Sequence, residues 1–126
     1  MIWTKTDPFL AIGADLHVRR RRRGHATILA VRGELDIATV PTLRARLDVL
    51  EPADMRDLIL DLDRVDYIAA AGLRALLGLR HRVEAHDGRL CLVSRRPQIR
   101  RLLRVTDLDK VLPIFDSVHA ARRDRP

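Results

Sequence analysis

The sequence predicts one α/β domain built on a mixed, mostly parallel sheet of about five strands, with four helices. Its length of 126 residues fits a single domain. Short apolar runs alternate with segments of helical spacing, in the order β-β-α-β-α-β-α-β-α, which is typical of parallel strands joined by right-handed crossovers. The run over residues 58–62 is almost entirely apolar, as expected for a central strand covered on both faces.

Residues 1–13 have no clear hydrophobic period, and we expect a flexible N-terminal arm there. The folded domain is expected over residues 14–122 and a C-terminal tail over residues 123–126. No apolar run approaches the length of a transmembrane helix, and the N-terminus lacks the features of a signal peptide. The single cysteine, Cys91, suits a reducing compartment. We therefore expect a cytoplasmic protein with no integral membrane segment.

Two strands, residues 16–18 and 27–31, form a predicted hairpin that turns at Gly24. Five consecutive arginines, Arg19 to Arg23, precede the turn. They could bind phosphate groups, or they could keep an exposed strand from pairing with other chains. We favour the second interpretation, because the net charge of +7 is spread along the chain and aromatic residues that could stack on bases are scarce.

The first helix follows Thr39, a suitable N-cap, and carries Pro41 in its first turn. Leucines at helical spacing give this helix a core-facing stripe of Leu43, Leu47 and Leu50. We expect Pro52 to end the helix, because proline in a helix interior removes a hydrogen bond.

The segment over residues 57–84 carries the strongest structural signal in the chain. It predicts a buried strand, a tight turn at Ala69-Ala70-Ala71-Gly72, and an amphipathic helix after Gly72. The apolar stripe of that helix consists of Leu73, Leu76, Leu77, Leu79 and Val83. Asp87-Gly88 supplies the turn residues that end it.

The C-terminal third continues the alternation of strand and helix. Residues 89–93 predict a strand, Pro97 opens a short helix, and residues 111–115 predict a final strand. Pro113 places this last strand at the edge of the sheet, because proline cannot donate a hydrogen bond to a ladder. Residues 117–122 predict a last short helix.

No constellation of reactive side chains points to catalysis. The five histidines have no spacing typical of a metal site, and no glycine-rich phosphate loop is present. Asp61, Asp63 and Asp66 cluster where Mg²⁺ could bind, but we favour a role in capping turns. Cys91 is expected to be a buried apolar residue. The sequence thus predicts a protein that is not an enzyme, with no metal and no cofactor.

The alanine turn leaves the following helix without an ordinary cap. A helix N-terminus has unpaired amides and a partial positive charge. Ala69, Ala70 and Ala71 offer those amides no side-chain oxygen, an omission that costs roughly 1 kcal/mol. Water, an anion or the backbone of a partner could take its place. Three small residues also leave a surface that a partner can approach closely.

Several segments, taken in order, resemble the STAS-domain family, which includes bacterial anti-sigma-factor antagonists. The matching segments are Gly33-Glu34-Leu35-Asp36 with Thr39, residues 58–62, 65–68 and 72–77, and then residues 90–93, 99–103 and 106–110. The likeness covers about residues 14–122. It implies a single STAS-type domain with helices packed mainly on one side of the sheet.

The resemblance also implies a protein switch. In the family, the unphosphorylated antagonist binds an anti-sigma factor, usually a histidine-kinase-like ATPase, and so frees the sigma factor. That kinase phosphorylates a hydroxyl at the start of this helix, and the added charge breaks the complex. The family motif Asp-Ser-Ser-Gly-Leu corresponds here to Ala69-Ala70-Ala71-Gly72-Leu73, so Ala70 takes the phosphoacceptor position and has no oxygen to phosphorylate.

The resulting hypothesis is a binding module that sequesters an anti-sigma factor and so regulates transcription. Its expected partner-binding residues are Asp36, Thr39, Ala69, Ala70, Ala71, Gly72 and Arg74. One alternative is a degenerate STAS accessory or scaffold subunit of a transporter or signalling assembly, motivated by the same missing hydroxyl. Another is a basic nucleic-acid or nucleotide-binding domain, ranked lower because no base-reading motif accompanies the arginines. We expect a monomer or a weak dimer.

Overall fold

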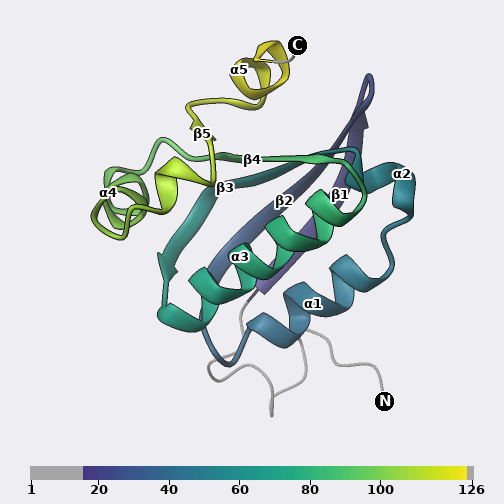
Figure 1. The fold of residues 1–126 in the computed structure, drawn as a ribbon. Helices are drawn as coiled ribbons and strands as arrows, with labels where there is room; N and C mark the ends of the chain where they lie inside the picture. Colours follow the sequence, from purple (N-terminus) through teal and green to yellow (C-terminus); the bar gives the residue numbers. More distant parts are fainter. Residues whose placement is uncertain (1–15, 125–126) are drawn as a thin grey trace.

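The computed structural model describes residues 16–124, which form one five-stranded sheet in the order β1-β2-β3-β4-β5 (Figure 1). The strands are β1 (Leu16–Arg23), β2 (Ala26–Leu35), β3 (Asp57–Ile68), β4 (Arg89–Val93) and β5 (Ile114–Phe115). β1 and β2 pair antiparallel, and the other neighbours pair parallel. The predicted fold class is confirmed. The expected arm over residues 1–13 and the end of the expected tail lie outside the described residues.

Helices cover both faces of the sheet unequally. They are α1 (Val40–Asp48), α2 (Pro52–Met55), α3 (Ala70–Ala85), α4 (Pro97–Val105) and α5 (Val118–Arg123), with a 3₁₀ turn at Leu108–Lys110. Figure 1 shows α1 and α3 crossing the same face of the sheet, and these two helices contact each other. Within residues 16–124, no helix is both long enough and apolar enough to cross a membrane.

The apolar core consists of two layers divided by the sheet. The larger layer joins the sheet to α1, α3 and α4, and the smaller layer joins it to α5. β3 supplies both layers, since Leu58 and Leu60 lie in the larger one and Ile59 in the smaller one, all fully buried. The near-continuous apolar run therefore reflects burial on both faces, as predicted.

Element boundaries differ from the predictions in several places. β1 continues to Arg23 and β2 to Leu35, beyond the predicted ends at residues 18 and 31. Pro52 does not end the first helix; α1 ends at Asp48, and Pro52 begins the short helix α2, where its missing N–H costs nothing. α3 begins at Ala70, so the predicted tight turn over residues 69–72 is largely the first turn of the helix. β5 comprises two residues because the 3₁₀ turn precedes it and residues 111–113 lie outside the ladder.

A buried carboxylate joins the β1–β2 hairpin to α2. Asp54, only 2% exposed, accepts hydrogen bonds from Arg20 at 2.7 Å and from Arg22 at 3.2 Å. The buried Thr27 hydroxyl donates to the same oxygen at 2.8 Å. The second carboxylate oxygen accepts from the Glu51 backbone N–H at 2.9 Å. Two of the five consecutive arginines are therefore structural.

The Asp54 environment sets the sign of a pH effect. Burial raises the pKa of this carboxyl, but the hydrogen bonds from Arg20, Glu51 and Thr27 and the charge of Arg20 outweigh burial. The pKa in the folded protein consequently lies below its ordinary value of 3.8. The unfolded chain then binds more protons, so this group stabilises the fold fully above pH 3.8 and loses that effect as pH falls through the folded-state pKa.

We predict that Asp54→Asn lowers the free energy of unfolding by about 2 kcal/mol at neutral pH, because the charged hydrogen bonds are lost. The variant should also lose part of the acid sensitivity below pH 3.8. Urea titrations over a pH series measure both effects. Asp48→Asn is the control, since Asp48 forms an exposed ion pair with Arg82 and should change stability by under about 0.5 kcal/mol. Equal losses in the two variants would contradict the prediction.

Candidate functional site

The carboxyl ends of β2 and β3 meet the N-terminus of α3 at one end of the sheet (Figure 1). Leu35 and Ile68 are in register at the ends of these strands. The Ala69 N–H donates to the Leu35 carbonyl at 2.9 Å, which joins the start of α3 to β2. The β2–α1 loop leaves the sheet at the same point. This arrangement brings the predicted residues of the β2–α1 loop and those at the start of α3 to the same end of the sheet.

Gly72 fixes how closely α3 approaches the sheet. A Cβ atom at this position would lie 2.6 Å from the Leu35 carbonyl oxygen and 2.9 Å from side-chain carbons of Leu35 and Ile68. Real Cβ atoms do not tolerate such distances to backbone atoms. The glycine is therefore required by the contact between helix and strand.

The first turn of α3 has no side-chain cap and no charged side chain of its own. Ala69 is the N-cap, with extended backbone (φ −88°, ψ 174°) and no side-chain hydrogen bond to the helix. Ala70 is exposed and no acidic residue lies in the first turn. Arg74 is exposed one turn further along, on the same side of the helix as Ala70. The helix start therefore presents donors and positive charge.

The β2–α1 loop is held by a reciprocal pair of side chains. The Asp36 carboxylate accepts from the backbone N–H groups of Ala38 and Thr39 at 2.9 and 3.0 Å. The Thr39 hydroxyl donates to the Glu34 carbonyl at 2.7 Å and accepts from the Asp36 N–H at 2.9 Å. Thr39 occupies the N-cap position as predicted, but its hydroxyl does not cap α1.

Two predicted surface residues are buried. Thr39 is 1% exposed, and Gly72 is also buried. Because both residues are buried, neither can contact a partner directly in this structure. Thr39 shapes the loop and Gly72 positions the helix, so both act on the surface through its exposed neighbours.

Two exposed apolar side chains at this end escaped the sequence interpretation. Ile37 in the β2–α1 loop is 79% exposed, and Tyr67 near the end of β3 is 55% exposed. Large apolar groups at one end of a domain mark contact surfaces when they adjoin polar groups. The signal for Ile37 was an isolated isoleucine in a polar turn. We call the residues Asp36, Ile37, Tyr67, Ala70 and Arg74 the end surface.

The other reactive groups have structural partners. The Asp63 carboxylate accepts from the Arg95 N–H at 2.7 Å, and Asp66 forms an ion pair with Arg96 at 3.0 Å. Asp61 accepts from the Asp63 N–H at 3.0 Å within β3, where the ladder with β2 shifts register, and so does not cap a turn as predicted. Residues 16–124 contain no group of three potential metal ligands. Cys91 is buried as predicted, and burial raises the pKa of its thiol.

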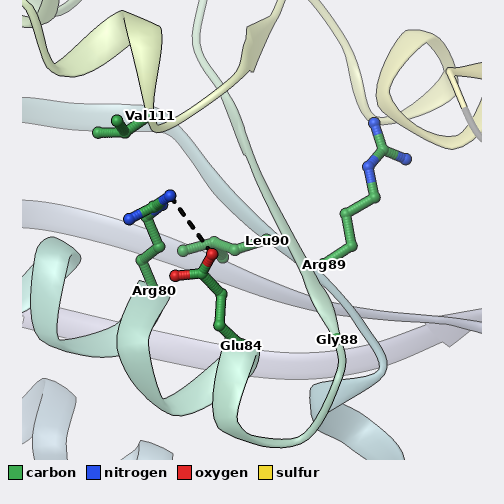
Figure 2. Close-up of a pocket in the computed structure, with 6 residues that line it drawn as sticks. All are labelled: Arg80, Glu84, Gly88, Arg89, Leu90 and Val111. Atoms are coloured by element: carbon green, nitrogen blue, oxygen red, sulfur yellow. Dashed lines mark ion pairs between the residues drawn. The ribbon is translucent and has the colours of Figure 1, made fainter.

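A shallow hollow of about 180 Å³ lies between the end of α3 and the segment before β5. Arg80 and Glu84, one turn apart on α3, form an ion pair of 3.3 Å at this hollow. Figure 2 shows this pair with Leu90 and Val111 nearby. The Arg89 side chain extends away from this pair and binds Asp124 at 2.7 Å. The charges at the hollow are thus already balanced, which makes the end surface the stronger candidate.

Comparisons with known proteins give a consistent picture. The sequence model of the STAS domain matches residues 17–121. The candidate anti-sigma factor antagonist BtrV of Bordetella bronchiseptica is 30% identical over 94 residues, covering 75% of this chain and 81% of that protein. The anti-sigma F factor antagonist of Paenibacillus polymyxa is 28% identical over 96 residues, which cover 74% of this chain and 82% of that protein. The crystal structure of an anti-sigma factor antagonist from Mycobacterium paratuberculosis gives a TM-score of 0.76 at 25% identity. The match covers 86% of this chain and 92% of that protein.

We predict that Gly72→Ala destabilises the protein by about 3 kcal/mol, because the new methyl group overpacks the contact with Leu35. Gly78→Ala is the matched control in the same helix, since a Cβ there meets nothing within 4 Å. That change should stabilise the helix by about 0.5–1 kcal/mol. Thermal or urea unfolding of both variants measures the difference. Similar stabilities for the two variants would contradict the close contact at Gly72.

Proposed function

This chain belongs to the STAS domain family, and we propose that it is an anti-sigma-factor antagonist that sequesters an anti-sigma factor through the end surface. The observation that carries the proposal is the likeness to relatives that are named as anti-sigma factor antagonists, over about three quarters of this chain. The matched range, residues 17–121, includes every member of the end surface.

The end surface has the composition of a protein contact. Ile37 and Tyr67 supply apolar area whose burial on a partner is favourable, by about 25 cal/mol per Å². Tyrosine and arginine are enriched among the residues that dominate binding energy, and Tyr67 and Arg74 are both exposed here. Ala69 and Ala70 let a partner's backbone approach the open amides of α3.

The proposed complex lacks a covalent switch at α3. The phosphoacceptor position of the family is occupied by Ala70, whose methyl group cannot accept a phosphoryl group. A phosphate at this exposed position would place about two negative charges inside the contact. We infer that the antagonist stays competent to bind a histidine-kinase-like ATPase even when that partner is loaded with ATP.

A degenerate scaffold subunit of a transporter or signalling assembly remains the second candidate, favoured by the same missing hydroxyl. The two functions differ in the partner. Calorimetric titration with each purified histidine-kinase-like anti-sigma factor of the same genome, with ADP or ATP present, separates them. The primary proposal requires binding to at least one of these proteins. Absence of binding at submillimolar concentrations to all of them overturns it.

We predict that Ala70→Asp weakens the complex at least about tenfold, because the new charge lies within the contact. The fold should be retained or slightly stabilised, since an acidic residue suits the first helical turn and can pair with Arg74 at i+4. Calorimetry measures the affinity and urea unfolding measures the stability.

The matched control for that variant is Ala53→Asp. Ala53 is also an exposed alanine in the first turn of a helix, α2, which precedes the opposite end of β3. The length of β3 separates the two sites by roughly 35 Å. If Ala53→Asp weakens the complex as much as Ala70→Asp, the contact does not involve the end surface.

We further predict that Ala70→Ser restores phosphorylation. The seryl oxygen would attack the γ-phosphorus of ATP bound to the partner kinase, releasing ADP, and its proton would pass to solvent or to a base of the kinase. Mass spectrometry of peptides from α3 should find phosphate in the variant and none in the parent chain. Because α3 of the parent chain contains no serine, threonine or tyrosine, absence of phosphate from the variant would contradict the prediction, and phosphate elsewhere in the parent would show that another residue serves as acceptor.

A further inference from the structure

β1 is a long and regular edge strand. Its register with β2 runs without a break from Leu16 opposite Gly33 to Arg23 opposite Ala26. Among the described strands it pairs with β2 alone. An edge of this kind presents a row of backbone donors and acceptors to any extended chain. Proteins usually protect such edges with bulges, short strands or charge, and β1 has only charge in its described part.

The charge lies on a defined face of β1. Leu16 and Val18 enter the core, and Arg20 and Arg22 on the same face bind Asp54. The strand period of two therefore directs Arg19, Arg21 and Arg23 to the opposite face. All three are exposed, and within residues 16–124 none of them forms an ion pair.

The same face carries one carboxylate, Asp61 of β3, in register with the Ala30 that stands opposite Arg19, and further cations on the neighbouring strands. Arg32 of β2 stands opposite His17 on one side and opposite Arg64 of β3 on the other. Both arginines are exposed, and like charges in register across strands repel each other. Edge protection does not require charge on β2 and β3, which are interior strands. Carboxylates from a partner would relieve this repulsion.

We propose that β1 accepts an acidic extended segment of a partner protein as an added strand. Carboxylates at every second residue of that segment would face Arg19, Arg21 and Arg23, because both strands repeat at roughly 6.6–6.8 Å per two residues. Main-chain hydrogen bonds along β1 supply affinity, and the carboxylates supply selectivity. The arginines repel a second copy of β1, so the charge that prevents self-association selects a strand of opposite sign.

The Asp54 cluster prepares the edge for this role. Arg20 and Arg22 hold the arginine-rich half of β1 against α2, so little chain entropy remains to be lost on strand addition. Nucleic acid fits the surface less well. The aromatic residues in the described part of the chain are Tyr67, near the far end of β3, and Phe115, on β5 at the opposite edge, so residues 16–124 provide no stacking platform beside β1.

The test uses fluorescent peptides and the full chain. One peptide alternates threonine and glutamate and spans the eight residues of β1. A second has lysine in place of glutamate, and a third has the composition of the first with all glutamates in one block. Fluorescence anisotropy should show binding of the alternating acidic peptide, at least about tenfold weaker binding of the block peptide, and none of the lysine peptide. Amide hydrogen exchange in β1 should slow when the acidic peptide is bound.

Charge reversal makes the test specific. Arg19→Glu/Arg21→Glu/Arg23→Glu should lose the acidic peptide and gain the lysine peptide, whereas Arg46→Glu/Arg101→Glu/Arg104→Glu, with the same change of charge on exposed helix positions, should bind like the parent. If the triple β1 variant does not fold, Arg21→Glu alone should weaken binding at least about threefold. Equal binding of block and alternating peptides, or tighter binding of duplex DNA through the same arginines, overturns the proposal.

Discussion

The position of α3 depends on a contact that leaves no room for a side chain. Gly72 lies against the Leu35 carbonyl, and the Ala69 N–H bonds that same carbonyl, so the helix start is fixed to the end of β2. The β2–α1 loop departs from the next residue and is held by Asp36 and Thr39. One close approach therefore places Ile37, Ala70 and Arg74 at the same end of the sheet. Without it, the residues of the end surface on α3 would not lie beside those on β3 and the β2–α1 loop.

The opposite end of β3 is organised by charge. Asp54 collects Arg20, Arg22 and Thr27 around one carboxylate and ties the hairpin to α2. The strand period then separates the arginines of β1 into two groups, one bound to Asp54 and one facing solvent. The consecutive arginines of β1 therefore have two roles. The two-residue period of the strand separates them, and Asp54, more than 30 positions away in the sequence, binds one of the two groups.

Most of the fold could be predicted because it follows from local periodicity. The apolar run of β3 and most of the leucine stripes of α1 and α3 are buried as predicted. Leu73 and Leu77 are only partly buried, and Leu50 lies beyond the end of α1. The features that escaped prediction depend on distant partners. Pro52 at the first position of α2 is a local start signal, but nothing local shows that Asp54 binds β1, because that bond joins residues 34 positions apart.

The candidate site was predictable in place but not in composition. Gly72 and the alanines marked the region, whereas the burial of Thr39 depends on the Glu34 carbonyl that its hydroxyl meets. Ile37 and Tyr67 were missed because exposure is a tertiary property, and an apolar residue in a turn has the same letter whether it is buried or not. Candidate contact residues of this kind are identified from the solvent exposure of the side chain in the structure and not from the sequence pattern.

The methyl group of Ala70 has a consequence for control. Since position 70 offers no covalent off-state at the start of α3, the amount of the chain gains weight as a control, because in the proposed complex the free anti-sigma factor is set by stoichiometric titration. The rates of synthesis and proteolysis then control the concentration of the chain. The transiently unfolded fraction matters too, because proteases degrade unfolded molecules. The packing at Gly72 and the carboxylate of Asp54 would act in such a circuit as determinants of dose.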